Sequence, residues 1–304
     1  MTPAIEIRQL TRVYGSRRGI QDVNLAIPAG SLYGFLGPNG AGKTTTIRVL
    51  LGFLRATAGS ARVLGLDCWR ESERLKAEVG AIPGDLRLWG WLTGDSALRL
   101  FSRIRRRDLV RRGEWLAEVL ELDLSVPVHK MSRGMRQKLG LILSMAHRPR
   151  VLILDEPTTA LDPLMQDHLR RLLRDEARAG TTVFFSSHTL AEVEDLCERV
   201  AIVRQGRIIA DDTLATLKAQ AGHDVEVLWP ADVEPPDPAR APAGLKLSFA
   251  TREKWTGKFS GALSELMSFL AAHPIADVRV ARPDLETLFM QYYRDEPEQN
   301  GGRP

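Results

Sequence analysis

Cysteine is scarce in this sequence of 304 residues, which contains only Cys68 and Cys197, far apart in the chain. Two separated cysteines exclude a disulfide framework and a CxxC pair for zinc or redox chemistry, which fits a reducing compartment. Long apolar runs are also missing, because charges, glycine or proline interrupt each one before the roughly 18 residues of a membrane-spanning helix. Glu6 lies where a secretory signal would need its apolar core. We therefore expect a cytoplasmic chain that has no signal sequence and does not cross a bilayer.

The composition that is present is typical of a folded protein. Hydrophobic residues make up 44% and charged residues 26%, which excludes a chain that is disordered throughout. At roughly 150 residues per domain, the length predicts two domains. The sequence pattern changes after Gly222, where a proline-rich loop separates segments in which apolar and polar residues alternate. We predict a larger domain over residues 1–222 and a smaller one over 223–304, with no internal repeat.

Basic residues are concentrated in the larger domain. Residues 1–222 contain 33 Lys and Arg against 25 Asp and Glu, whereas residues 223–304 contain 9 against 13. The densest basic run consists of six arginines: Arg103, Arg105, Arg106, Arg107, Arg111 and Arg112. Two interpretations of this run stay open, namely helix positions exposed to water, or contacts with a partner protein or anionic lipid headgroups.

Three short apolar segments predict buried strands, at residues 31–35, 151–154 and 182–185. Because their apolar residues are continuous rather than alternating, they favour strands covered on both faces of a mostly parallel sheet. Residues 86–150 are mainly helical in pattern and predict a helical subdomain inserted between the first two strands.

The smaller domain has a different pattern. Apolar residues alternate or cluster over residues 225–229, 245–249, 255–259 and 278–280, and helical spacing occurs over 261–273 and 285–292. These patterns predict a small α+β domain.

A glycine-rich loop follows the strand of residues 31–35 and precedes a predicted helix. Its glycines allow successive N–H groups to face one concavity at a helix N-terminus, where the dipole also favours an anion. Lys43 can bridge the β- and γ-phosphates of a nucleotide, and the Thr44 hydroxyl can bind Mg²⁺. The candidate phosphate-binding residues are Gly37, Pro38, Asn39, Gly40, Ala41, Gly42, Lys43, Thr44 and Thr45. The predicted fold class is therefore α/β: a P-loop NTPase core with an inserted helical subdomain, followed by a small α+β C-terminal domain.

Two carboxylates end the second predicted strand. Asp155 and Glu156 follow four apolar residues and should lie at the carboxyl edge of the sheet, where open α/β sheets bind ligands. Asp155 is the candidate to hold Mg²⁺, through water, and Glu156 is the candidate general base that orients and polarises the attacking water. The pattern is weak alone, and its pairing with the glycine loop makes it specific.

Ser132 precedes a helical stripe of apolar residues and is a predicted N-cap. A serine hydroxyl and the amide of Gly134 at an exposed helix N-terminus also form an anion site. The capping role and a phosphate contact are compatible.

Five motifs, taken together and in this order, resemble the ATP-binding subunit of an ABC transporter over about residues 4–220. They are the glycine loop, the signature around Ser132, Leu154–Thr158, Ala160–Asp162 and Ser187–His188. The combination is far more specific than any one of its members.

The resemblance implies a role for each matching residue. Tyr14 lies where the family stacks an aromatic ring on adenine, and His188 corresponds to the histidine that contacts the γ-phosphate. Asp162 lies in the loop that reaches the other subunit, and Ser132 with Gly134 closes on ATP across the dimer. The implied catalytic residues are Lys43, Glu156 and His188, and the implied Mg²⁺ ligands are Thr44 and Asp155.

Two segments depart from the family pattern. The signature normally reads Leu-Ser-Gly-Gly-Gln, and Met131–Met135 keeps only its serine and second glycine. The loop into the helical subdomain normally presents a glutamine, where this chain has Gly84 beside Asp85, so that role is absent or belongs to Asp85. These forms, and the ending Arg282–Met290, resemble the ATPases that serve separate permeases of the ABC-2 type, including antibiotic and drug exporters.

The resemblance implies an ATPase that binds ATP and Mg²⁺, forms a homodimer around ATP and powers a multispan ABC-2-type permease on another chain, for export. Residues 1–222 would be the ATP-binding domain, peripheral on the cytoplasmic face of the membrane, and residues 223–304 an accessory domain. The alternative is a soluble ABC-type ATPase acting on nucleic acid or the ribosome. Because the chain lacks the coiled-coil or zinc insertions, or the second ATPase core, of such proteins, we expect no nucleic-acid partner. A small-molecule kinase would not account for Ser132 and His188.

Overall fold

The computed structural model describes residues 3–15, 17–220 and 222–281. The chain divides into two compact units, Met1–Asp212 and Thr213–Pro304. This division comes earlier than residue 222 because helix α8 (Leu214–Gln220) groups with the second unit. The domain boundary at residue 222 stays a prediction.

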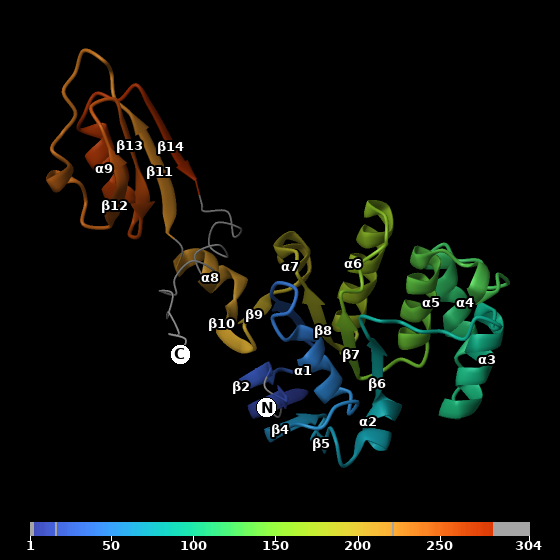
Figure 1. Cartoon of the computed structure of the whole chain (residues 1–304). Coiled ribbons are helices and arrows are strands. Elements are labelled where there is room, and N and C mark those ends of the chain that lie inside the picture. The colour runs from blue at the N-terminus through green and yellow to red at the C-terminus, as the bar shows by residue number, and fades with distance from the viewer. Residues whose placement is uncertain (1–2, 16, 221, 282–304) are drawn as a thin grey trace. The chain divides into compact units, whose positions relative to one another are not determined.

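A six-stranded sheet forms the centre of the first unit, in the order β10–β9–β3–β8–β7–β6 (Figure 1). Its strands are β3 (Leu32–Leu36), β6 (Val79–Ile82), β7 (Val151–Asp155), β8 (Thr182–Ser187), β9 (Arg199–Arg204) and β10 (Arg207–Thr213). The pairs β6 with β7, β7 with β8, β8 with β3 and β3 with β9 are all parallel, which confirms the prediction from the apolar runs. The carboxyl ends of these strands therefore share one edge, where the loops after β3, β7 and β8 meet.

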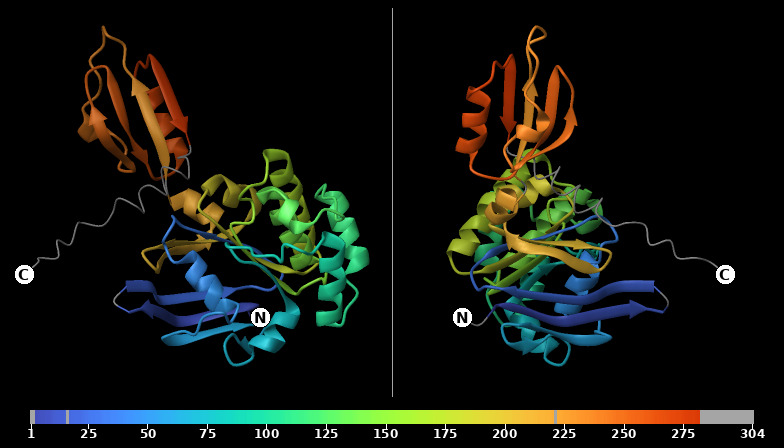
Figure 2. Two further views of the ribbon diagram at one scale, coloured as in Figure 1. Left: turned by 45° about the vertical axis from the view of Figure 1, so that its right-hand side comes forward. Right: turned by 90° about the vertical axis from the view of Figure 1, so that its left-hand side faces the viewer.

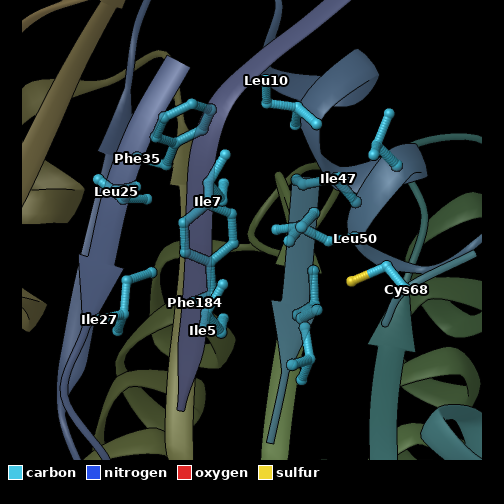
Figure 3. Close-up of a cluster of buried hydrophobic side chains, with 14 of the residues drawn as sticks. Ile5, Ile7, Leu10, Leu25, Ile27, Phe35, Ile47, Leu50, Cys68 and Phe184 are labelled. Carbon is cyan, nitrogen blue, oxygen red and sulfur yellow. The ribbon is translucent and has the colours of Figure 1, made fainter. Parts of the chain in front are cut away.

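A second sheet, of four antiparallel strands, was not predicted from the sequence. Its order is β2–β1–β4–β5, with β1 (Ile5–Tyr14), β2 (Arg17–Ile27), β4 (Ala58–Val63) and β5 (Leu66–Asp67) (blue and cyan in Figure 2). Helix α1 (Lys43–Leu50) contacts β2 and β4 of this sheet and β7 of the larger one. Figure 3 shows the shared core, in which Ile7 of β1, Ile47 of α1 and Phe184 of β8 belong to one buried cluster. Burial of this apolar surface holds the helix behind the glycine loop in place.

Strands β7 and β8 are buried on both faces. Ile153 and Phe184 belong to the cluster around α1, whereas Leu154 and Phe185 are equally buried outside that cluster. Helices α6 (Pro163–Arg178) and α7 (Leu190–Leu196) contact β3 and β8 and account for this second covered face.

One short helix, α2, follows β5, and a helical subdomain is inserted between β6 and β7, as predicted (green in Figure 1). The helices are α2 (Ser72–Glu78), α3 (Gly94–Arg105), α4 (Val110–Val119), the 3₁₀ turn η1 (Val128–Lys130) and α5 (Arg133–Met145). The predicted fold class is confirmed. Over the described residues, none of the helices combines the length and apolar character that spanning a bilayer requires.

Three of the six arginines in the basic run make hydrogen bonds or ion pairs within the first unit. Arg105 donates to two backbone carbonyls of α2, Arg107 pairs with Glu78 at 3.0 Å, and Arg112 pairs with the buried Glu176 at 2.5 Å. These three arginines join the helical subdomain to α2 and α6, which neither interpretation of the run foresaw. The other three are exposed: Arg103, Arg106 and Arg111.

Beyond α8, the described part of the second unit contains a four-stranded antiparallel sheet and one further α-helix, which agrees with the predicted α+β domain. The sheet order is β12–β13–β11–β14, with β11 (His223–Leu228), β12 (Leu245–Ala250), β13 (Lys254–Phe259) and β14 (Asp277–Ala281). The 3₁₀ turn η2 (Pro238–Arg240) lies between β11 and β12. Trp229 and Trp255 pack edge to face at 5.0 Å, in a core that includes Leu266 and Leu270 of α9 (Leu263–Ala271). The helix predicted over 285–292 and the ending Arg282–Met290 lie outside the described residues.

The buried imidazole of His147 predicts acid sensitivity. His147 lies between α5 and β7 and is 5% exposed; burial, and then the charge of Arg105, lower its pKa to about 4. Between about pH 6.5 and about pH 4, His147 binds a proton in the unfolded chain but not in the folded one. The free energy of unfolding therefore falls as the pH falls through this range. We expect a loss of about 2 kcal/mol between about pH 7.5 and about pH 5 from this group. Urea unfolding of the wild type and of His147→Leu at both pH values measures this loss of stability. If the variant loses as much stability as the wild type, His147 is not its cause.

Candidate active site

The glycine loop connects β3 to α1 at the carboxyl edge of the sheet. Gly42 is the N-cap of α1 and has a φ of 108°, a conformation that residues with side chains rarely adopt. A Cβ at Gly37 would lie 2.4 Å from the carbonyl oxygen of Val203. Glycine is therefore required at both positions, and the first N–H groups of α1, which have no partner within the helix, are left for an anion.

Lys43 lies buried within this loop, with only 4% of the residue exposed. Its Nζ donates to the carbonyl oxygens of Gly37 at 2.6 Å and Pro38 at 3.2 Å, and it lies 3.2 Å from Glu156 Oε1. A buried ammonium group needs such oxygen partners. Phosphate oxygens bound in the loop could take their place.

Asp155 ends β7 and is 2% exposed. Its Oδ2 accepts a hydrogen bond from Thr44 Oγ1 at 2.8 Å, and its Oδ1 accepts one from Ser186 Oγ at 2.6 Å. The structure thus brings the two candidate Mg²⁺ ligands together. Hydroxyl and carboxylate oxygens fit Mg²⁺, which usually keeps its other positions for water and phosphate oxygens.

Glu156 brings the three implied catalytic residues into one group. Its Oε1 faces Lys43 Nζ at 3.2 Å, and its Oε2 lies 3.3 Å from His188 Nδ1. The side chains of Glu156 and His188 are 27% and 50% exposed, so water can reach both. They follow β7 and β8, and Lys43 begins α1, so all three lie at the predicted edge of the sheet.

Tyr14, at the end of β1, is 41% exposed. The Arg12 guanidinium lies 5.0 Å from the centre of its ring. A Cβ on Gly19 would lie 2.8 Å from Tyr14 Cε2, and a Cβ on Gly42 would lie 3.1 Å from the Gly19 carbonyl oxygen. The ring is therefore on the same side as the phosphate loop and is accessible for stacking.

Ser132 is the N-cap of α5, as predicted, and its Oγ accepts a hydrogen bond from the Met135 N–H at 3.2 Å. Gly134 lies against the segment after Glu156, because a Cβ there would be 2.7 Å from the Ala160 carbonyl oxygen. No hydrogen bond joins Ser132 or Gly134 to the glycine loop within the part of the chain that the structure describes.

Asp162 is the N-cap of α6. Its Oδ1 accepts a hydrogen bond from the Met165 N–H at 3.0 Å, and this backbone hydrogen bond is the main reason why the pKa of Asp162 is lowered. The side chain is exposed to solvent.

The missing glutamine is not replaced by Asp85. The Asp85 carboxylate is 64% exposed and pairs with Arg87 at 2.8 Å. Gly84 instead approaches the site with its backbone, since a Cβ there would lie 2.9 Å from Asp155 Oδ2. Of the two alternatives that the sequence left open, the structure favours absence of that side chain.

Ser186 is the residue of this site that sequence reasoning missed. It lies directly opposite Asp155 in the parallel register of β7 and β8 and is fully buried. The sequence contained a signal, a hydroxyl residue two positions before His188, but only the strand register shows which carboxylate it meets.

The chemistry that this arrangement allows is attack of water on a phosphoryl group. The loop and Lys43 can hold the phosphates, Thr44 and Asp155 can hold a divalent cation, and the Glu156 carboxylate can accept a proton from water.

Comparison with known proteins agrees with this geometry. The family model described as "ABC transporter" matches residues 20–159. The bacitracin transport ATP-binding protein BcrA of Bacillus licheniformis is 35% identical over 72% of this chain and 72% of its own length. The daunorubicin resistance ATP-binding protein DrrA2 of Streptomyces coeruleorubidus is 32% identical over 95% of this chain and 94% of its own. A solved ATP-binding subunit of an ABC transporter superposes with a TM-score of 0.68 at 28% identity, over 71% of this chain and 92% of that one.

Proposed function

Since the chain belongs to the ABC transporter family as an ATP-binding subunit, which binds ATP and hydrolyses it to power transport, we propose that it works with Mg²⁺ as a homodimer on a separate export permease. Glu156 is the general base in this proposal, Lys43 and His188 hold the γ-phosphate, and Tyr14 stacks on adenine. The observation that carries it is the position of Glu156 between Lys43 Nζ and His188 Nδ1, at 3.2 and 3.3 Å.

Mg²⁺ would be held by Thr44 and Asp155, whose oxygen atoms are 2.8 Å apart. The ion would neutralise charge on the phosphate oxygens. The chain itself orients these two ligands, because Thr44 is fixed by α1 and Asp155 by β7.

The proposal of a dimer is supported by the position of the signature. Ser132 is exposed at the start of α5, and Gly134 packs against Ala160 rather than against the glycine loop of its own chain. A second copy facing the first would bring each signature to the other copy's phosphate loop. Such an arrangement is isologous and closes at two subunits.

The proposal of export by a separate permease of the ABC-2 type rests on the relatives and on the unusual signature. Two relatives bear the names of bacitracin transport and daunorubicin resistance proteins, and DrrA2 matches both units of this chain. The protein would act at the cytoplasmic face of the membrane. The internal contacts of Arg105, Arg107 and Arg112 leave the nucleic-acid alternative with less support.

ATP-dependent dimerisation tests the proposal. The Glu156→Gln chain should double its mass with ATP and Mg²⁺, measured by light scattering after size exclusion, and remain a monomer with ADP. Adding Ser132→Arg should abolish the dimer while leaving binding of a fluorescent ATP analogue intact. The permease is tested by purifying the wild-type chain from membranes and identifying the multispan protein that accompanies it. A chain that stays monomeric with ATP contradicts the dimer.

A further inference from the structure

Ser186 lies next to both acidic residues of the site, Asp155 and Glu156, and can contact both at once. It pairs with Asp155 in the register of β7 and β8, and the residue has no exposed surface. It is too deeply buried to touch a nucleotide, so any role in the reaction must pass through other residues.

The Ser186 hydroxyl bonds to both acidic residues. Its Oγ donates to Asp155 Oδ1 at 2.6 Å and accepts a hydrogen bond from the Glu156 N–H at 3.2 Å. A hydroxyl has one donor hydrogen and two acceptor lone pairs, so it can make both bonds at once. The other oxygen of Asp155 accepts from Thr44 Oγ1, and the carboxylate is thereby held at both ends.

Glu156 needs such support because its backbone is strained. Its φ is 49°, in the left-handed region that residues other than glycine rarely occupy. Such conformations persist only where the surroundings hold them. The Glu156 N–H is held by the carbonyl oxygen and the hydroxyl of Ser186, each at 3.2 Å.

We propose that Ser186 is a positioning residue for ATP hydrolysis, whose hydroxyl sets the orientation of Asp155 and of Glu156 relative to each other. The inference rests on the proposed roles of these two residues. It predicts that loss of the hydroxyl slows hydrolysis and weakens the response to Mg²⁺, with little effect on nucleotide binding itself. A hydroxyl that merely satisfies a buried strand end would change stability alone.

Ser186→Ala tests the proposal, with Ser144→Ala as the matched control. Ser144 is also a buried serine, 4% exposed, but its hydroxyl donates to the Leu141 carbonyl within α5. For Ser186→Ala we expect kcat to fall about 10- to 100-fold, as for other groups that orient metal ligands. The Mg²⁺ concentration for half-maximal binding of a fluorescent ATP analogue should rise, while binding without Mg²⁺ stays within about twofold of wild type, as for Ser144→Ala. Thermal unfolding of both variants shows whether they are folded.

A second comparison tests whether Ser186→Ala slows hydrolysis through Glu156 or through a general loss of structure. In single turnovers, Ser186→Ala should slow the wild-type enzyme but add little to the loss already caused by Glu156→Gln, because residues acting as a unit are not additive. Full additivity, or a Ser186→Ala variant that matches Ser144→Ala in kcat and in Mg²⁺ response, overturns the inference. A wild-type chain without ATPase activity would instead overturn the proposed function.

Discussion

Replacing Glu156 with glutamine should lower kcat for ATP hydrolysis by about 10²- to 10⁴-fold, the usual contribution of a general base. Glutamine keeps the shape of the side chain but cannot accept the proton from the attacking water. ATP should bind at least as tightly as to the wild type, because the change removes a negative charge 3.2 Å from Lys43 Nζ and so leaves that ammonium free for phosphate. Release of phosphate and equilibrium binding of a fluorescent ATP analogue measure the two effects.

Glu198→Gln is the matched control for this prediction. It removes the same charge from an exposed residue just before β9, whose first residues lie at the amino edge of the parallel sheet, away from the glycine loop. Its kcat should stay within about twofold of wild type, as for most surface substitutions. If Glu156→Gln hydrolysed ATP within a few-fold of the wild-type rate, Glu156 would not be the general base.

Replacing Lys43 with alanine should weaken ATP binding about 10- to 100-fold, which corresponds to a charged hydrogen bond of about 1.5–3 kcal/mol. The loss has two parts. The phosphates lose the ammonium group, and the Glu156 carboxylate, now without its partner at 3.2 Å, repels them. Titration with a fluorescent ATP analogue measures the combined effect.

The two parts can be separated by a double-mutant cycle. Adding Glu156→Gln to Lys43→Ala should recover part of the lost affinity, because it removes the repulsion. Arg48→Ala is the control, since Arg48 is an exposed cation on the same helix, and it should bind ATP as the wild type does. An unchanged affinity after Lys43→Ala would show that the lysine does not contact phosphate.

The irregular antiparallel sheet shows where prediction from the sequence fails. Strands β1 and β2 pair with register shifts between Ile7 and Leu10, and Gln9 there has a φ of 47°. A bulge breaks the two-residue alternation by which a strand is recognised, so the buried residues Ile5, Ile7 and Leu10 do not follow one period. The strands of the second unit, whose apolar residues alternate, were predicted.

Among the site residues, those with local signals were located from the sequence. The glycine loop before α1 and the cap at Ser132 each depend on residues that are neighbours in the chain.

The sequence by itself determined the family, the phosphate loop and three of the parallel strands, because these follow from residue types at short spacing. The tertiary structure decided which distant groups meet. Ser186 was found to join Asp155 and Glu156 only through the strand register, and Asp85 was found to pair with Arg87 rather than to enter the site. A hydrogen bond or ion pair depends on a separation of about 3 Å between atoms, and for residues far apart in the chain only the packing of sheets and helices sets that distance.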